Sequence, residues 1–368
     1  MFVRKGRRKL NWNPAVMKQI ILVLAVVVAT LFARPVLAQT SNPTNTTEQA
    51  SSIATGSAIV RTATAQTTGM ISSRVSSFLA PAAVADQGGD GDMVAALYDE
   101  MSLGTGISAG GGDGRMGVWG SGSWTDIEDD LVSTAYDGDV YNAMIGADYQ
   151  FNCCLTAGLA LGYESTDIDT TFNTGGVEST GWTIAPYAGY VLNRYFTVDA
   201  SAGYSIIDYD TKRVANSVTI NGNFGSDRWF ASGAINGYYS VNKILLSGRA
   251  GYSYAKESQD GFNESDGVVN SARDVKAGTL RVGGTAAYDL GKAQPYLTAT
   301  GVYDVQQTKV TVAAGQAAPS NDKSGVDVGG GVRISLSDRV TGGIEGTTHL
   351  ARDNFKSTTV SGNLRIKF

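Results

Sequence analysis

Segments in which apolar and polar residues alternate recur from residue 115 to the end of the chain, and they restrict its fold more than any other feature. The last segment shows the pattern most clearly. It sets Val360, Gly362, Leu364, Ile366 and Phe368 against Ser361, Asn363, Arg365 and Lys367. A period of two residues is typical of β-strands whose two faces meet different surroundings. Each of these segments is therefore predicted to be a strand with one apolar and one polar face.

About twelve such segments follow residue 115, an even number as in single-chain bacterial outer-membrane barrels. Their approximate spans are 115–124, 136–152, 154–165, 178–192, 195–208, 225–240, 243–256, 273–290, 293–305, 323–336, 339–350 and 355–368.

The connections between these segments carry independent information. Short connections, such as Asn193-Arg194 and Asn242-Lys243, alternate with long polar ones until the shorter connection at 351–354. The long ones are expected at 125–135, 166–177, 209–224, 257–272 and 306–322. Outer-membrane barrels have short periplasmic turns and longer extracellular loops. We therefore expect an all-β fold, a twelve-stranded antiparallel transmembrane β-barrel over residues 114–368.

The N-terminus predicts export. A basic stretch from Arg4 to Lys18 precedes an apolar run, Ile20 to Phe32, and small residues before Gln39 complete the pattern of a cleaved signal peptide over residues 1–38. Seven of the 29 basic residues lie in this segment, so 22 remain against 34 acidic ones. An acidic exported chain is a poor partner for nucleic acid, because that binding depends on Lys and Arg meeting phosphates.

Residues 39–113 are rich in Ser, Thr, Ala and Gly and read as a low-complexity linker. Within it, Ala63 to Leu79 places apolar residues three and four apart, which predicts a weakly amphipathic helix over 63–79. The segment before this helix contains no internal repeat and no protease or esterase motif, so little passenger is expected there.

Candidate reactive residues are few. Cys153 and Cys154 are adjacent and cannot build a disulfide framework. His349 is the only histidine, and strand parity places it in the lumen near the outer rim. Two acidic segments, 125–130 and 260–267, offer oxygen ligands for calcium, but solvated loops explain them more simply. We therefore expect no enzymatic activity, no metal site and no cofactor.

Four segments together resemble the autotransporter β-domain family: GVWGSGSW (117–124), YVLNRYFTVDASAGYS (190–205), GRAGYSYA (248–255) and the terminal NLRIKF (363–368). The resemblance covers residues 115–368 and implies a translocator in the Gram-negative outer membrane. It also implies insertion by the barrel-assembly machinery with periplasmic chaperones, and an assembly signal formed by Val360, Leu364, Ile366 and Phe368.

In that family a helix upstream of the barrel occupies the pore, and 63–79 is the implied counterpart. A helix rich in Thr, Ser and Gln is expected to meet a polar lumen without burying apolar surface. We expect a monomeric barrel surrounded by outer-membrane lipid. Two alternatives to a translocator stay open, a porin-like channel and an adhesin that acts through its surface loops.

Overall fold

The computed structural model describes residues 50–85, 115–131, 134–309, 322–337 and 340–367. The expected signal peptide, residues 1–38, and the terminal Phe368 lie outside these ranges.

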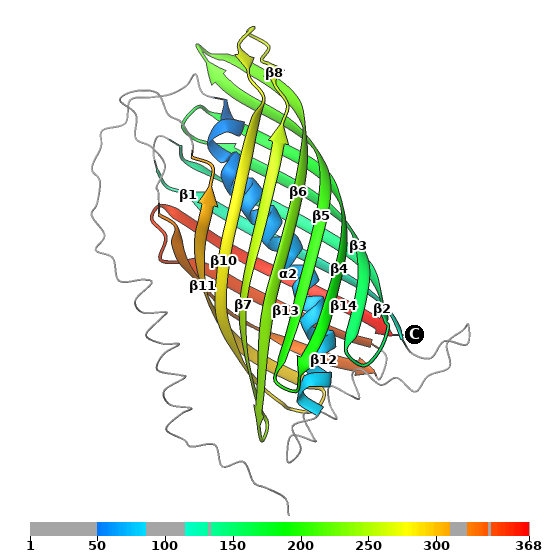
Figure 1. Ribbon diagram of the computed structural model, residues 1–368. Helices are drawn as coiled ribbons and strands as arrows, with labels where there is room; N and C mark the ends of the chain where they lie inside the picture. The colour runs from blue at the N-terminus through cyan, green and yellow to red at the C-terminus, as the bar shows by residue number, and fades with distance from the viewer. Residues whose placement is uncertain (1–49, 86–114, 132–133, 310–321, 338–339, 368) are drawn as a thin grey trace, which may run out of the picture. The chain divides into compact units, whose positions relative to one another are not determined.

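Twelve antiparallel strands close into a barrel in which every strand pairs with two neighbours (Figure 1). Closure is made by β1, which places Trp124 opposite Tyr141 on β2 and opposite Val360 on β14. A closed barrel has no free edge, so the ladder bonds satisfy its backbone groups in lipid. The predicted twelve-stranded antiparallel barrel is confirmed. Its strands are β1 (Met116–Asp129), β2 (Tyr136–Gln150), β3 (Leu155–Thr170), β4 (Gly175–Asn193), β5 (Phe196–Ala215), β6 (Val218–Val241), β7 (Ile244–Gln259), β10 (Arg273–Tyr288), β11 (Ala293–Gln307), β12 (Ser324–Ser337), β13 (Val340–Leu350) and β14 (Phe355–Lys367).

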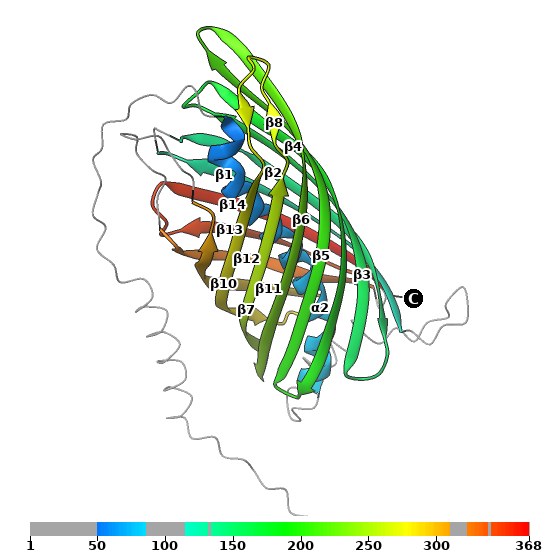
Figure 2. The same ribbon diagram turned by 45° about the horizontal axis from the view of Figure 1, so that its top comes forward.

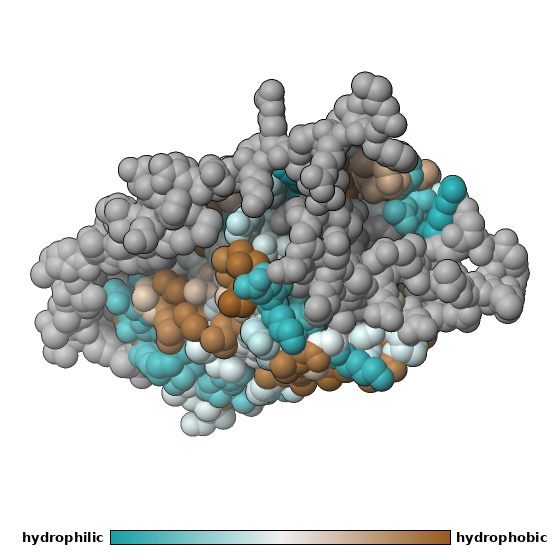
Figure 3. Space-filling view, turned by 90° about the horizontal axis from the view of Figure 1, so that it is seen from below, coloured by the Kyte–Doolittle hydropathy of each residue, from teal (hydrophilic) through white to brown (hydrophobic). Residues whose placement is uncertain are grey.

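The two faces of the strands differ as the alternation predicts. On β3, Leu159, Leu161 and Tyr163 are exposed on the outside, whereas Ala160 and Glu164 at alternate positions are buried in the interior. Seen from the end at which the helix finishes, apolar and hydrophilic patches lie side by side on the described surface (Figure 3). The outward apolar side chains suit lipid, and the inward polar ones form the lumen.

Two of the expected long loops, 166–177 and 209–224, are wrong. The strands continue through both segments, and β3 turns into β4 within residues 171–174. Between β5 and β6 only Asn216 and Ser217 remain, with φ of 51° and 63°, the left-handed conformation of a tight hairpin turn. In these segments the outward face becomes polar, as at Asp167 and Asp210, whereas Ile168, Tyr209 and Phe224 stay buried in the interior, so the apolar outer stripe ends although the strands continue.

The β5–β6 hairpin reaches beyond most of its neighbours at one end of the barrel (Figure 2). Beside it, the β7–β10 connection forms a small hairpin of β8 (Phe262–Asn263) and β9 (Val269–Asn270). Phe262 stacks on Phe224 of β6 at a centroid distance of 4.8 Å, which fixes the connection against the hairpin. We call this the loop end of the barrel, and the opposite end, with connections such as 151–154 and 242–243, the turn end.

One helix, α2 (Ser51–Ala85), lies inside the ring of strands (Figures 1 and 2). It begins well before the predicted 63–79 because its first turns, rich in Ser, Thr and Ala, find partners on the barrel wall. A helix of poor intrinsic propensity forms when tertiary contacts stabilise it. No helix among the described residues is long and apolar enough to cross a bilayer.

Candidate functional site: the lumen around α2

The direction of α2 is fixed by hydrogen bonds at its first turn. Ser51 Oγ donates to the carbonyl of Lys212 at 2.8 Å and lies 2.8 Å from Thr170 Oγ1. Arg273 Nη2 donates to the carbonyl of Ser52 at 2.6 Å. These partners stand at the loop-end termini of β3, β5 and β10, so α2 enters the lumen at the loop end and runs toward the turn end.

Apolar side chains seat α2 on one side of the barrel wall. Ile59 and Ala63 join a cluster with Val140 and Ile168 of β2 and β3. Farther along the helix, a second group of buried side chains packs around Trp119, Met144 and Tyr187, namely Met70, Ile71, Val75 and Leu79. The expectation that α2 meets the lumen without burying apolar surface is wrong. The spacing of Met70, Ile71, Val75 and Leu79 indicated this stripe, and the Ser and Thr residues occupy the other positions of the same turns.

Between the two apolar clusters, neutral polar side chains bind the wall. Gln66 Nε2 donates to Thr125 Oγ1 at 2.8 Å and to the carbonyl of Val140 at 2.9 Å. Asn142 Nδ2 donates to Thr67 Oγ1 at 2.8 Å. These bonds satisfy groups that would otherwise be costly to bury, and they fix the rotation of α2.

A buried ion pair holds the turn-end half of α2. Arg74 donates to both carboxylate oxygens of Asp148, from Nε at 2.7 Å and from Nη2 at 2.6 Å. The two side chains are only 4% and 2% exposed. Tyr187 donates its hydroxyl to Asp148 at 3.1 Å and accepts a hydrogen bond from Trp119. A bidentate guanidinium–carboxylate pair combines strength with a fixed geometry, so this network defines where the helix lies.

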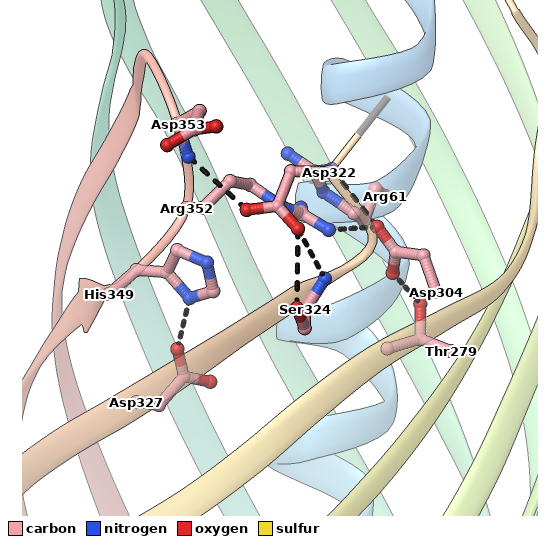
Figure 4. A network of polar contacts seen from close by, with 9 residues as sticks. All are labelled: Arg61, Thr279, Asp304, Asp322, Ser324, Asp327, His349, Arg352 and Asp353. Atoms are coloured by element: carbon pink, nitrogen blue, oxygen red, sulfur yellow. Dashed lines mark hydrogen bonds and ion pairs between the residues drawn. The ribbon is translucent and has the colours of Figure 1, made fainter. Parts of the chain in front are cut away.

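A second ion-pair cluster lies nearer the loop end (Figure 4). Asp304 of β11 accepts hydrogen bonds from Arg61 of α2, at 3.3 Å, from Arg352 and from Thr279. The guanidinium of Arg61 also lies 4.5 Å from the ring centre of Phe355, a cation–π distance. The Asp304 carboxylate therefore links α2 to β10 and to the connection between β13 and β14.

His349 lies in the lumen close to this cluster (Figure 4). Its Nδ1 is 2.6 Å from Asp327 Oδ1, and Arg281 donates to the other oxygen of the same carboxylate at 2.8 Å. In the described part of the chain no group forms a hydrogen bond with His349 Nε2. Asp327 therefore orients the ring, and no hydroxyl among these residues stands in the position of a nucleophile.

The two cysteines lie in the β2–β3 turn at the turn end. Their sulfur atoms are 3.3 Å apart, and both thiols are free. The turn is shaped by Asn152, whose side-chain oxygen accepts the N–H groups of Cys154 and Leu155 at 2.8 Å each.

The two acidic segments form ion pairs. Lys356 Nζ donates to Asp130 at 2.8 Å, and this hydrogen bond lowers the pKa of the Asp130 carboxyl. In the second segment, Arg213 donates to Glu264 and to Asp266, each at 2.8 Å. Among the described residues, no three His, Cys, Asp or Glu side chains are grouped closely enough to hold a metal ion.

Carboxylates also form a row on the outside of the barrel near the loop end. Each member is directly opposite the next one on the neighbouring strand, from β1 to β5. The carboxylate row consists of Asp126, Asp139, Asp167, Glu178 and Asp210. Like charges placed directly opposite each other destabilise a sheet, so this row costs stability.

The expected assembly signal lies on β14. Val360, Leu364 and Ile366 are exposed on the outer face of the strand, at 39%, 46% and 38%. Phe368 lies outside the described residues.

Comparison with known proteins decides the family. Residues 118–347 match the model of the autotransporter β-domain. The chain belongs to the autotransporter β-domain family. It is an outer-membrane β-barrel of the autotransporter type, located in the Gram-negative outer membrane.

Solved autotransporter β-domains share its fold. The translocator domain of NalP from Neisseria meningitidis aligns with 69% of this chain and 89% of its own, with a TM-score of 0.61 and 13% identity. The β-domain of Bordetella BrkA aligns with 69% of this chain and all of its own, with a TM-score of 0.59 and 17% identity.

A curated relative gives a match in sequence. The 25 kDa outer-membrane immunogenic protein of Brucella ovis is 30% identical over 126 residues, which are 34% of this chain and 56% of that protein. This autotransporter β-domain chain therefore spans about half the length of the curated relatives that it matches.

Proposed function

We propose that this barrel exports the part of the chain that precedes α2 to the cell surface, and that α2 then stays seated in the lumen. The observation that carries the proposal is the direction of α2. Ser51 is bound at the loop end by Thr170 and Lys212, and Arg74 is bound near the turn end by Asp148. With the loop end outside the cell, the chain before Ser51 leaves the barrel on the extracellular side.

An epitope placed before α2 tests this orientation. We expect a tag inserted between Thr44 and Asn45 to bind antibody, and to be cut by added protease, on intact cells. The matched control is the same tag in the β2–β3 turn at 152–153, which should be reached only after the outer membrane is permeabilised. If the tag before α2 stays protected on intact cells while the barrel is folded, the export proposal is wrong.

We further propose that the barrel-assembly machinery inserts this domain as a monomer after periplasmic chaperones deliver it, reading Val360, Leu364, Ile366 and Phe368. Three of these side chains stand on one outward face of the strand that closes the barrel against β1. Deleting Phe368 should lower the amount of heat-modifiable barrel in outer membranes, whereas Lys367→Ala should not. Equal amounts of folded barrel from both variants would refute the role given to Phe368.

A further inference from the structure

The helix does not fill the lumen evenly. The hydrogen bonds of Gln66, Thr67 and Arg74 go to β1 and β2, whereas Ala65, Gly69, Ser73 and Ser77 follow one another at intervals of four on the opposite side of the helix. Gly69 and Ser73 are exposed to open space although they lie inside the barrel. A Cβ added at Gly69 would meet no atom within 4 Å.

Two cavities occupy the space on this side of α2, with volumes of about 290 and 330 Å³. Both are lined by Ala65, Gly69 and Ser73 of the helix and by the same wall residues, including Arg281 and Glu345. Because they share these residues, we treat them as one space and call it the lumenal cleft.

The cleft extends along most of the barrel. At the loop end it is lined by Arg352 of the 351–354 connection, and toward the turn end it reaches Tyr238 and Leu245, which flank the 242–243 connection. Its wall carries hydroxyls and glycines, such as Thr298, Thr300 and the unsubstituted backbone of Gly283. A polar cavity of this size holds several waters.

The charged groups on the cleft are mostly guanidinium groups. Five arginines line it against two carboxylates, Asp327 and Glu345; the arginines are Arg61, Arg249, Arg281, Arg333 and Arg352. Several of these arginines are paired with carboxylates that do not line the cleft. Asp199, which binds Arg249, is 4% exposed, while the Arg249 side chain is 35% exposed. Arg281 is 38% exposed.

We propose that the barrel conducts small hydrated anions along the lumenal cleft while α2 remains seated. Arginine-lined constrictions favour anions because they replace part of the hydration of the ion with a positive field. The guanidinium groups of Arg249 and Arg281, whose side chains are 35% and 38% exposed, line the cleft from β7 and β10. Gly69 lines both cavities, so the absence of a side chain at this position sets the width of the cleft there.

Planar-bilayer recordings of the full chain in a KCl gradient test the proposal. The wild-type protein should show a small steady conductance. Its reversal potential should be shifted from zero toward the equilibrium potential of chloride. Gly69→Trp should remove most of the conductance, because a Cβ at this position meets no atom within 4 Å and the indole extends from it into the cleft, whereas the matched control Gly69→Ala should keep it. Helix content and heat modifiability should be the same in both variants.

Selectivity gives the second readout. Arg281→Gln should shift the reversal potential toward the equilibrium potential of potassium, because Asp327 then faces the cleft without its arginine partner. Arg281→Lys should keep the sign of the wild-type reversal potential. The proposal is overturned if the inserted full chain is silent, if Gly69→Trp conducts like wild type, or if the wild-type pathway prefers cations.

Discussion

Removing the guanidinium of Arg74 while keeping an unbranched apolar side chain, with Arg74→Met, should release the turn-end half of α2 from the barrel wall. The variant leaves Asp148 in a site that is 2% exposed, with the Tyr187 hydroxyl still within 3.1 Å. Methionine keeps the apolar stem and helix propensity of arginine. The change therefore acts on the ion pair rather than on the helix.

The magnitude follows from the burial of the pair. Removing one partner of a buried ion pair costs about 3–5 kcal/mol when the other charge is left without compensation. Arg365 lies near the Asp148 carboxylate, so the expected cost is at the lower end of this range. Each 1.4 kcal/mol is about a factor of ten in an equilibrium constant. If a cost of about 3–5 kcal/mol falls wholly on the seated state, the population with a released helix rises by about a hundredfold to a few thousandfold.

Single-channel recording of the full chain measures this population. Arg74→Met should show brief openings, much larger than the conductance of the lumenal cleft, and far more often than wild type. Ser73→Ala is the matched control, since its side chain faces the cleft and carries no charge. The double variant Arg74→Met/Asp148→Asn should open less often than Arg74→Met, because it leaves no buried carboxylate unpaired. The reasoning is refuted if Arg74→Met, folded and inserted like wild type, opens no more often.

Three further predictions concern the barrel itself. Arg213→Ala removes a guanidinium that is 3% exposed and bound to Glu264, so protease should cut the 260–272 connection faster while the heat-modifiable barrel persists; unchanged cutting would contradict this. Asp167→Asn relieves repulsion within the carboxylate row by about 0.2–1 kcal/mol for each opposed pair, so the heat-modification midpoint should rise, most at low salt, and an equal shift at high salt would contradict it. Gly325→Ala places a Cβ 2.3 Å from the His349 ring and should destabilise the barrel by about 1–3 kcal/mol, which an unchanged midpoint would refute.

The barrel could be predicted from the sequence because lipid and lumen impose opposite demands on alternate residues. Leu159, Leu161 and Tyr163 had to face lipid whatever the rest of the chain did, so strand existence and count followed from local pattern alone. Local pattern does not predict the strands where their outward face becomes polar. In 166–177 and 209–224 the strands continue above the membrane, and the tight turn at Asn216-Ser217 was read as part of a loop.

The contacts of α2 could not be predicted from local sequence pattern for a different reason. Strand parity places Asp148 in the lumen, since it follows Asn142 and Met144 on the same face of β2. Its partner Arg74 is separated from it by the linker and by β1, and no local rule states how far the helix advances into the barrel. The early start of α2 has the same cause, because Ser51 is held by residues more than a hundred positions away.

The two apolar clusters suggest how release of α2 would proceed. Ile59 and Ala63 belong to the cluster nearer the loop end, whereas Ile71, Val75 and Leu79 belong to the other, and neutral polar bonds from Gln66 and Thr67 lie between them. The loop-end half keeps its Ser51, Arg61 and Arg273 contacts when Arg74 is replaced. Release should therefore be partial, so the openings of Arg74→Met should reach a level below that of a barrel freed of the whole helix. A single full-size level in Arg74→Met would instead mean that the two halves of α2 leave together.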